Sequence, residues 1–203
     1  SFIRLDPYTK AIKLGPDSAG YRVGVCWAES GIETVSISDC HVILGYLNPD
    51  NFLGGQVKLD RQRAYDAMKE QIADPLGLTV EEAAAGVIEL LDSELRDYLR
   101  SMISGKGYSP SSFTCFSYGG AGPVHTYGYT EGLGFEDVIV PAWAAGFSAF
   151  GCAAADFEYR YDKSLDVNIE ETATDDAKEI EAKTLNDAWQ ELAERVLEEF
   201  ELN

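Results

Sequence analysis

The chain has 203 residues, 16 Lys and Arg against 35 Asp and Glu, a net charge of −19 and a pI near 4.3. This charge repels phosphate at long range, which argues against nucleic acid or an anionic membrane as the main partner. A 45% apolar and 11% aromatic composition is typical of a folded globular protein, and no apolar run is long enough to span a membrane.

The first elements in the chain are short. Strands are predicted at Ile12–Leu14, Arg22–Trp27 and Glu33–Ser38, separated by turn residues. A helix is predicted from Asp39 to Tyr46, with Asp39 as its N-cap.

Two longer helices follow. Leu59–Ala73 is predicted to be a helix capped by Asp60 and broken by Asp74-Pro75-Leu76-Gly77. The second runs from Thr79, which opens a capping box, to about Ser104, because its apolar residues recur every three or four positions.

The next stretch alternates strand and helix, which predicts an α/β layer architecture with some parallel pairing. The predicted elements are a strand at Phe113–Tyr118, a helix at Val124–Leu133, a strand at Val138–Val140 and a helix at Gly146–Phe157.

The sequence after residue 157 changes in character. All 19 glycines fall at or before Gly151, whereas the region from Asp156 onward holds 16 acidic and 5 basic residues. We therefore predict an α/β body over residues 1–157 and an acidic extension over 158–203. Asp175–Phe200 of that extension is predicted to form an amphipathic helix that packs on the body or on a neighbouring chain.

The cysteines are widely spaced and include no CxxC pair, which argues against a zinc site or a redox motif. They are Cys26, Cys40, Cys115 and Cys152. We expect reduced thiols in a cytoplasmic protein, and we predict no metal site on this chain.

The most distinctive motif is the turn Gly119-Gly120-Ala121-Gly122-Pro123, between a predicted strand and a predicted helix. Glycines let a ligand approach the backbone, and the following helix offers free N–H groups to an anion or a nucleotide. The turn fits neither the Rossmann fingerprint nor the P-loop. A tight turn without a ligand remains the alternative.

Two further residues are candidates for chemistry. His125 follows the turn, where it could bind an anion or simply bond to the backbone at the helix start. Asp39 could be a plain helix cap or a carboxylate linked to a metal or nucleotide; His41 lies close to it. The sequence supports no catalytic triad.

Phe116–His125 reads FSYGGAGPVH and is similar to the FGGAGPLH phrase of the hydantoinase A/oxoprolinase family. Five further phrases of that family occur here in the family's order, at Gly15–Gly20, Ile37–Gly45, Tyr46–Gly55 with Leu59-Asp60, Lys106–Phe113 and Val140–Gly151. Val23–Glu29 departs from the usual PGPACYG phrase, and His41 replaces an Asn. These departures resemble the ketone carboxylase branch of the family.

The resemblance implies an actin-like, ribonuclease-H-like ATPase fold in which the glycine turn, Gly119 to Pro123, lies near the adenosine. The family's earlier phosphate-binding phrases are not matched here. We therefore expect this chain to be a segment of a longer subunit, inactive by itself, with the Mg²⁺ and γ-phosphate ligands elsewhere.

The resemblance further implies that ATP activates bicarbonate and acetone by phosphorylation, giving acetoacetate, AMP and phosphate. His125 and Asp39 are then candidate catalytic residues. The other subunits of a cytoplasmic bacterial heterohexamer would be the partners, and one of them would hold Mn²⁺. The alternatives are a component of an ATP-dependent hydantoinase or 5-oxoprolinase, a subunit for an aromatic ketone, and a purely structural docking segment.

Overall fold

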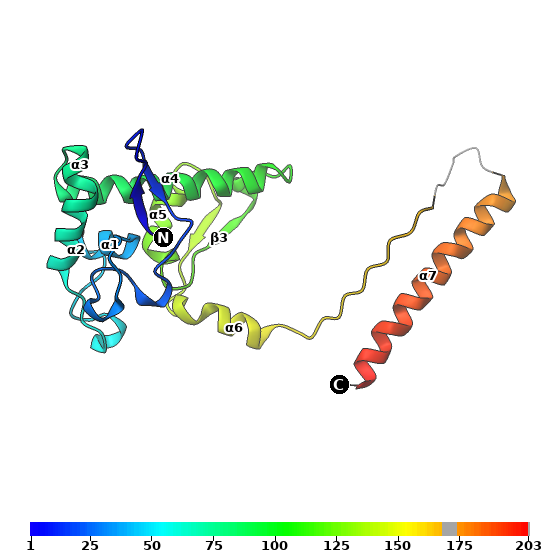
Figure 1. Ribbon diagram of the computed structural model, residues 1–203. Helices are drawn as coiled ribbons and strands as arrows, with labels where there is room; N and C mark the ends of the chain where they lie inside the picture. The colour runs from blue at the N-terminus through cyan, green and yellow to red at the C-terminus, as the bar shows by residue number, and fades with distance from the viewer. Residues whose placement is uncertain (168–173, 203) are drawn as a thin grey trace. The chain divides into compact units, whose positions relative to one another are not determined.

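The computed structural model describes residues 1–167 and 174–202. The chain divides into two compact units, Ser1–Phe150 and Gly151–Asn203 (Figure 1). The boundary predicted between residues 157 and 158 stays a prediction.

The first unit begins with a hairpin and continues into a group of packed helices. Strand β1 (Ile3–Leu5) pairs antiparallel with β2 (Ile12–Leu14), and Ile3 lies opposite Leu14. The helices are α1 (Ile37–Ile43), α2 (Arg61–Met68), a π-helical stretch (Lys69–Ala73), α3 (Asp74–Leu76) and α4 (Val80–Ser104).

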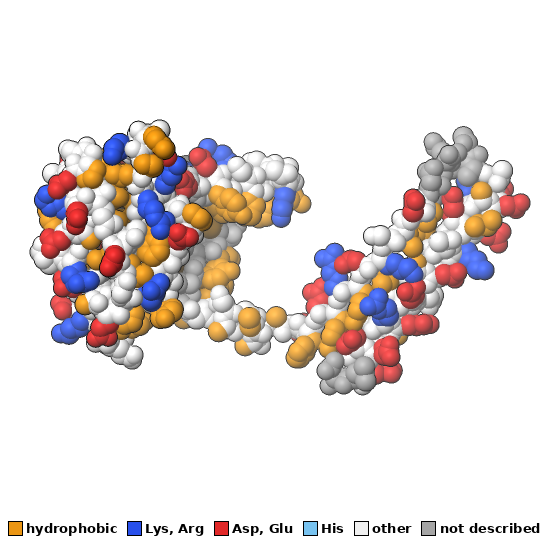
Figure 2. All heavy atoms as spheres, viewed as in Figure 1, with side chains coloured by type: hydrophobic (Ala, Val, Ile, Leu, Met, Phe, Trp, Pro, Cys, Tyr) orange, Lys and Arg blue, Asp and Glu red, His pale blue; other side chains and the backbone are white. Residues whose placement is uncertain are grey.

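Helix α4 is the central element of this unit, because it packs against α1, α2 and α5. Thr79 and Glu82 form the expected capping box, and Gly105 is the C-cap. Five apolar side chains of its first half are buried in the core: Val80, Ala83, Ala84, Val87 and Ile88. Its second half carries the exposed apolar side chains Leu95, Tyr98 and Met102. Figure 2 shows hydrophobic side chains gathered on the projecting part of this helix.

A β–α–β unit forms a second layer beside α4. Strand β3 (Thr114–Phe116) pairs in parallel with β4 (Asp137–Ile139), with Cys115 opposite Val138. Helix α5 (Gly122–Thr130) connects the two strands, and α6 (Phe147–Ala154) follows them. The predicted alternation of strand and helix with parallel pairing is therefore confirmed.

The second unit contains helix α7 (Asp175–Leu202), where a helix over Asp175–Phe200 was predicted. The extended segment before it packs on this helix, since Tyr159 meets Phe200 edge to face and Arg195 lies over the Tyr161 ring. Lys163 pairs with Glu191. Residues 168–173 and 203 of the predicted acidic extension lie outside the described residues.

The strands predicted at Arg22–Trp27 and Glu33–Ser38 are wrong. Short 3-10 turns at Gly20–Arg22 and Ala28–Ser30 occupy this region, and α1 begins at Ile37. The physical reason is the Asp39 carboxylate, which accepts hydrogen bonds from the N–H groups of Val25 and Cys26. A side chain thus takes the donors that a neighbouring strand would use.

The predicted start of α1 is also wrong. Ser36 is the N-cap, and Asp39 is the third residue of the helix, where its carboxylate accepts from the Ser36 N–H. Together they form a capping box, a pattern in which Asp here takes the place of the usual Glu or Gln. The sequence signal was present but assigned one turn too late.

Asp60 is confirmed as the cap of α2, accepting from the N–H groups of Gln62 and Arg63. The helical run does not stop at the predicted end, Ala73, but extends three residues into the predicted break Asp74-Pro75-Leu76-Gly77. The chain continues for one turn to Leu76, because a proline is tolerated in the first turn of a helix. The run ends at Gly77, which has a φ of +69°.

Substituting Gly24 with alanine tests the carboxylate-centred packing. A Cβ there would lie 2.3 Å from Ser36 Oγ and 2.5 Å from Asp39 Oδ2. We expect Gly24→Ala to lower the free energy of unfolding by about 2 kcal/mol, measured by denaturant titration. The matched control is Gly86→Ala on α4, whose Cβ meets nothing within 4 Å and which should stabilise by about 0.5–1 kcal/mol. Equal stability of the two variants would contradict this account.

Candidate functional site

The glycine turn predicted from the sequence, Gly119 to Pro123, connects β3 to α5. Two hydrogen bonds hold the chain as it enters the turn. The N–H of Ser117 donates to the Ile139 carbonyl at 2.9 Å, and the N–H of Gly119 donates to the Ala144 carbonyl at 2.9 Å. The entry to the turn is therefore fixed to the backbone of β4 and of the segment after it.

The turn itself is open on its outer side. A Cβ added at Gly119 or Gly120 would meet nothing within 4 Å, and Gly120 and Ala121 are exposed. Gly119 has a φ of +89°, which other residues rarely adopt. The backbone is thus held in place while its outer face remains accessible to a ligand.

A buried hydroxyl network fixes the exit from the turn. Ser117, which is 2% exposed, accepts hydrogen bonds from Thr126 Oγ1 at 2.7 Å and from the Tyr129 hydroxyl at 2.5 Å. Because Ser117 directly follows β3 and both partners lie on α5, this network ties the end of the strand to the helix on the other side of the turn.

His125 lies on the first turn of α5 and is only 5% exposed. Its Nδ1 is 2.7 Å from Asp92 Oδ1 on α4, and its Nε2 is 2.9 Å from His41 Nε2 on α1. It is therefore bonded to two side chains and not to the backbone. Both ring nitrogens are engaged, so the geometry favours a positioning role over direct contact with a substrate; the catalytic role stays a prediction.

The chemistry of Asp92 fixes the direction of this hydrogen-bonded chain. An ionised carboxylate can only accept, so Nδ1 of His125 carries the proton. In the neutral ring Nε2 of His125 is then the acceptor, and Nε2 of His41 must be the donor. The order Asp92, His125, His41 follows from this.

Burial lowers the pKa of His41 to about 4, and the neighbouring His125 contributes in the same direction. A proton added to His41 would be desolvated and would lie next to a second imidazole. His41 is therefore neutral in the native state at neutral pH.

Arg96 adds a second link between α4 and α5. Its guanidinium donates to the Gly128 carbonyl through Nη2 at 2.6 Å and through Nε at 3.1 Å. Gly128 also permits the close approach of Asp92, because a Cβ there would lie 1.9 Å from Asp92 Oδ2. The side chain that orients His125 thus depends on a glycine one turn further along α5.

Asp39, the other candidate catalytic residue, has 0% exposure. Its two oxygens accept four hydrogen bonds, from the N–H groups of Val25, Cys26 and Ser36 and from the Ser36 hydroxyl. These contacts favour a structural carboxylate; a catalytic role for it stays a prediction. Burial, and then the Asp39 charge, raise the pKa of the Cys26 thiol, so it stays protonated.

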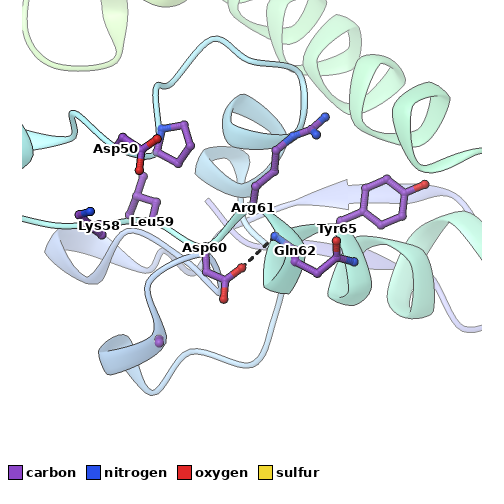
Figure 3. A pocket seen from close by; sticks show the side chains of 9 residues that line it. Asp50, Lys58, Leu59, Asp60, Arg61, Gln62 and Tyr65 are labelled. Carbon is purple, nitrogen blue, oxygen red and sulfur yellow. Dashed lines mark hydrogen bonds between the residues drawn. The ribbon is translucent and has the colours of Figure 1, made fainter.

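An open pocket lies elsewhere in the first unit, around the start of α2 (Figure 3). It is lined by residues of both charges, among them Asp50, Lys58 and Asp60. The Arg61 guanidinium is committed to the Ile43 carbonyl at 2.8 Å, and Asp60 occupies the N–H groups of the helix start. These features do not favour an anion there.

Among residues 1–167 and 174–202 there is no group of three His, Cys, Asp or Glu side chains placed to hold a metal ion. In the same residues no helix is both long and apolar enough to cross a membrane. All four cysteines are free thiols.

Comparison with known proteins identifies the family of this chain. The model of the hydantoinase/oxoprolinase family matches residues 1–161. The chain belongs to the hydantoinase/oxoprolinase family. The sequence-based identification of this family is therefore confirmed.

Individual members of the hydantoinase/oxoprolinase family are also similar to this chain. It is 83% identical, over its whole length, to 28% of the acetone carboxylase beta subunit of Xanthobacter autotrophicus. It is 35% identical, over 91% of its length, to 26% of caprolactamase subunit alpha of Pseudomonas jessenii. The acetophenone carboxylase gamma subunit of Aromatoleum aromaticum is 34% identical over 86% of the chain and 24% of that subunit.

Solved structures agree with these sequence relationships. The nucleotide-free acetone carboxylase structure matches with a TM-score of 0.78 over 99% of this chain and 28% of that one. The ATP-dependent caprolactamase of Pseudomonas jessenii matches at 33% identity with a TM-score of 0.75, over 97% and 27% of the two chains. The chain thus spans little more than a quarter of these relatives.

Sequence reasoning missed two residues of the family chain's buried cluster. Asp92 lies on the polar side of a long helical pattern and resembles many surface carboxylates. His41 was noted as a neighbour of Asp39 and as a replacement for an Asn of the family phrase, but its pairing with His125 was not predicted. The one sequence feature related to Asp92 is Gly128, because a side chain at that position would collide with the Asp92 carboxylate. The sequence alone does not show that these two residues are in contact.

Acid should destabilise the protein through His41. In the unfolded chain its pKa is about 6.5, whereas in the folded protein it is about 4. Between pH 6.5 and pH 4, His41 is protonated in the unfolded state but not in the native state. About 3 kcal/mol of stability is therefore lost as the pH falls through this range. We expect unfolding free energies measured across this range to fall less steeply for His41→Gln. An identical pH slope in both proteins would contradict the assignment.

Proposed function

We propose that this chain is part of the ATP-using subunit of an acetone carboxylase. The support is its 83% identity, over all 203 residues, to an acetone carboxylase beta subunit. The matching structure concerns ATP-dependent acetone carboxylation. Because the chain spans 28% of that subunit, the activity belongs to a longer polypeptide and its complex.

The structural observation that supports nucleotide binding by this chain is the geometry of the glycine turn. Gly119 and Gly120 leave open space where other residues would place a Cβ, and both flanks of the turn are hydrogen-bonded to neighbouring elements. A pre-formed, accessible backbone followed by a helix start suits part of a nucleotide. We assign Gly119, Gly120, Ala121, Gly122 and Pro123 to that contact.

The proposed fold is a segment of an actin-like, ribonuclease-H-like ATPase. Its support is the parallel β3–β4 pair joined by α5. Two parallel strands of three residues do not make a stable sheet by themselves, and parallel sheets are normally covered on both faces. Val138 and Ile139 of β4 are exposed here, as expected if further strands and helices complete the layer.

The chemistry explains why ATP is needed. Bicarbonate is a poor electrophile and acetone a poor nucleophile, and phosphoryl transfer from ATP would activate both on the way to acetoacetate, AMP and phosphate. Such transfers bring negative charges together and require cationic groups or metal ions. This chain contributes backbone N–H groups to nucleotide binding. The Mg²⁺ ligands and a Mn²⁺ site belong, in this proposal, to other parts of the enzyme.

The partners in this proposal are the remainder of the subunit and the other subunits of a bacterial cytoplasmic hetero-oligomer, a heterohexamer. Acetone carboxylase beta and acetophenone carboxylase gamma are both named as subunits, which supports a multi-subunit enzyme. The long acidic helix α7, with exposed Trp189 and Leu197, offers a surface for such contacts.

The second candidate function is ATP-dependent opening of a cyclic amide. It is favoured by the 35% identity and the 0.75 TM-score to the caprolactamase. The glycine turn cannot separate the two functions, because both use ATP. The substrate that stimulates ATP consumption can.

A valine at position 120 should block nucleotide binding without disturbing the fold. Its side chain would enter the space reserved for the ligand, where nothing lies within 4 Å. We expect Gly120→Val to weaken MgATP binding by the assembled enzyme at least about tenfold, measured by calorimetry. Gly86→Val on α4, also in open space, is the control and should bind as the wild type does. Unchanged binding by Gly120→Val would support an empty structural turn.

The reaction itself is tested by ATP consumption with different substrates. We expect acetone plus bicarbonate to stimulate AMP and phosphate release by the assembled enzyme, and hydantoin, 5-oxoproline and caprolactam to leave it at the basal rate. If a cyclic amide and not acetone stimulated ATP consumption, the result would contradict the acetone carboxylase proposal and support the second candidate function.

A further inference from the structure

A chain of three buried or half-buried side chains crosses the first unit directly behind the glycine turn. It begins at Asp92 on α4, whose side chain is 16% exposed, and passes through His125 on α5 to His41 on α1, which is 4% exposed. The two hydrogen bonds are 2.7 and 2.9 Å long. Three helices thus meet through one polar connection.

Each link of this chain depends on the previous one. The Asp92 carboxylate holds the proton of His125 on Nδ1, which leaves Nε2 as the acceptor for the His41 Nε2–H. Without Asp92 as acceptor, His125 could adopt the Nε2–H tautomer, and the donor and acceptor roles of the two imidazoles would no longer be fixed. The link from α5 to α1 would lose its defined geometry, whereas Arg96 would still connect α5 to α4.

The position of His125 relates this chain to the turn. It is the fourth residue of α5, after Gly122, Pro123 and Val124, so its Cα is fixed within one helical turn of the glycines. On the entry side, Gly119 is held by the Ala144 carbonyl. The N–H groups of Gly120, Ala121 and Gly122 can point toward a ligand only if both sides of the turn are held.

We propose that Asp92, His125 and His41 are positioning residues for the nucleotide, acting together to hold the start of α5 so that the Gly119–Pro123 backbone keeps its binding conformation. This inference rests on the proposed nucleotide site. Its new content is the assignment of Asp92 and His41, which lie on helices outside the turn, to nucleotide affinity.

The test compares two substitutions at position 41 in the assembled enzyme with its complete subunits. The Gln Nε2 lies about as far from its Cβ as the imidazole Nε2 does, so His41→Gln can still donate to His125. His41→Leu has a similar bulk and cannot donate. We expect His41→Leu to raise the KM for ATP about tenfold with kcat changed less than about threefold, and His41→Gln to restore most of the affinity.

A merely structural role would give a different pattern. Val87→Ala, which removes core methyl groups from α4 without touching the polar chain, should lower the folded fraction and hence Vmax, with KM for ATP unchanged. If His41→Leu behaves in the same way as Val87→Ala, or if His41→Gln is as impaired as His41→Leu, the proposal is wrong.

Asp92→Asn provides an independent measurement should His41→Leu not fold. The amide keeps the shape but weakens the preference for the Nδ1–H tautomer of His125, so we expect a KM for ATP raised about threefold or more. An unchanged KM would overturn the proposal. Failure of the nucleotide site itself shows separately, because Gly120→Val would then also leave KM for ATP unchanged.

Discussion

A hydrogen bond between two imidazoles, His41 on α1 and His125 on α5, joins the helical core to the layer that carries the glycine turn. It requires one donor and one acceptor, and the Asp92 carboxylate determines which ring plays which part. Burial excludes a further proton from His41 at neutral pH. The geometry of the turn thus depends on which ring nitrogens of His41 and His125 carry protons. Asp92 on α4, 33 residues before His125, determines this.

The elements that could be predicted from the sequence are those defined by local signals. The capping box at Thr79, the Asp60 cap and the strand–glycine–helix order around residue 119 depend on neighbours a few positions away, and the structure confirms them. The strand predicted at Arg22–Trp27 failed because Asp39, 13 or more residues away, takes its backbone donors. The pairing of His41 with His125, 84 residues apart, had no local signal either.

Several surfaces of the first unit are apolar and exposed. The relatives are much longer than this chain, and further parts of a longer subunit would cover such surfaces. The second half of α4 and the aromatic group of Phe116, Trp143 and Phe150 lie open, although large exposed apolar areas normally mark contacts. The chain spans 28% of the acetone carboxylase beta subunit it resembles. In the proposed function, the rest of the subunit covers these surfaces and supplies the phosphate ligands.

The central claim is that the backbone of the glycine turn contacts the nucleotide. Hydrogen–deuterium exchange of the assembled enzyme, with and without MgATP, measures this directly. We expect slower exchange at the amides of Gly120, Ala121 and Gly122 when nucleotide is bound. Exchange that is unchanged in this segment while other parts of the enzyme become protected would contradict it.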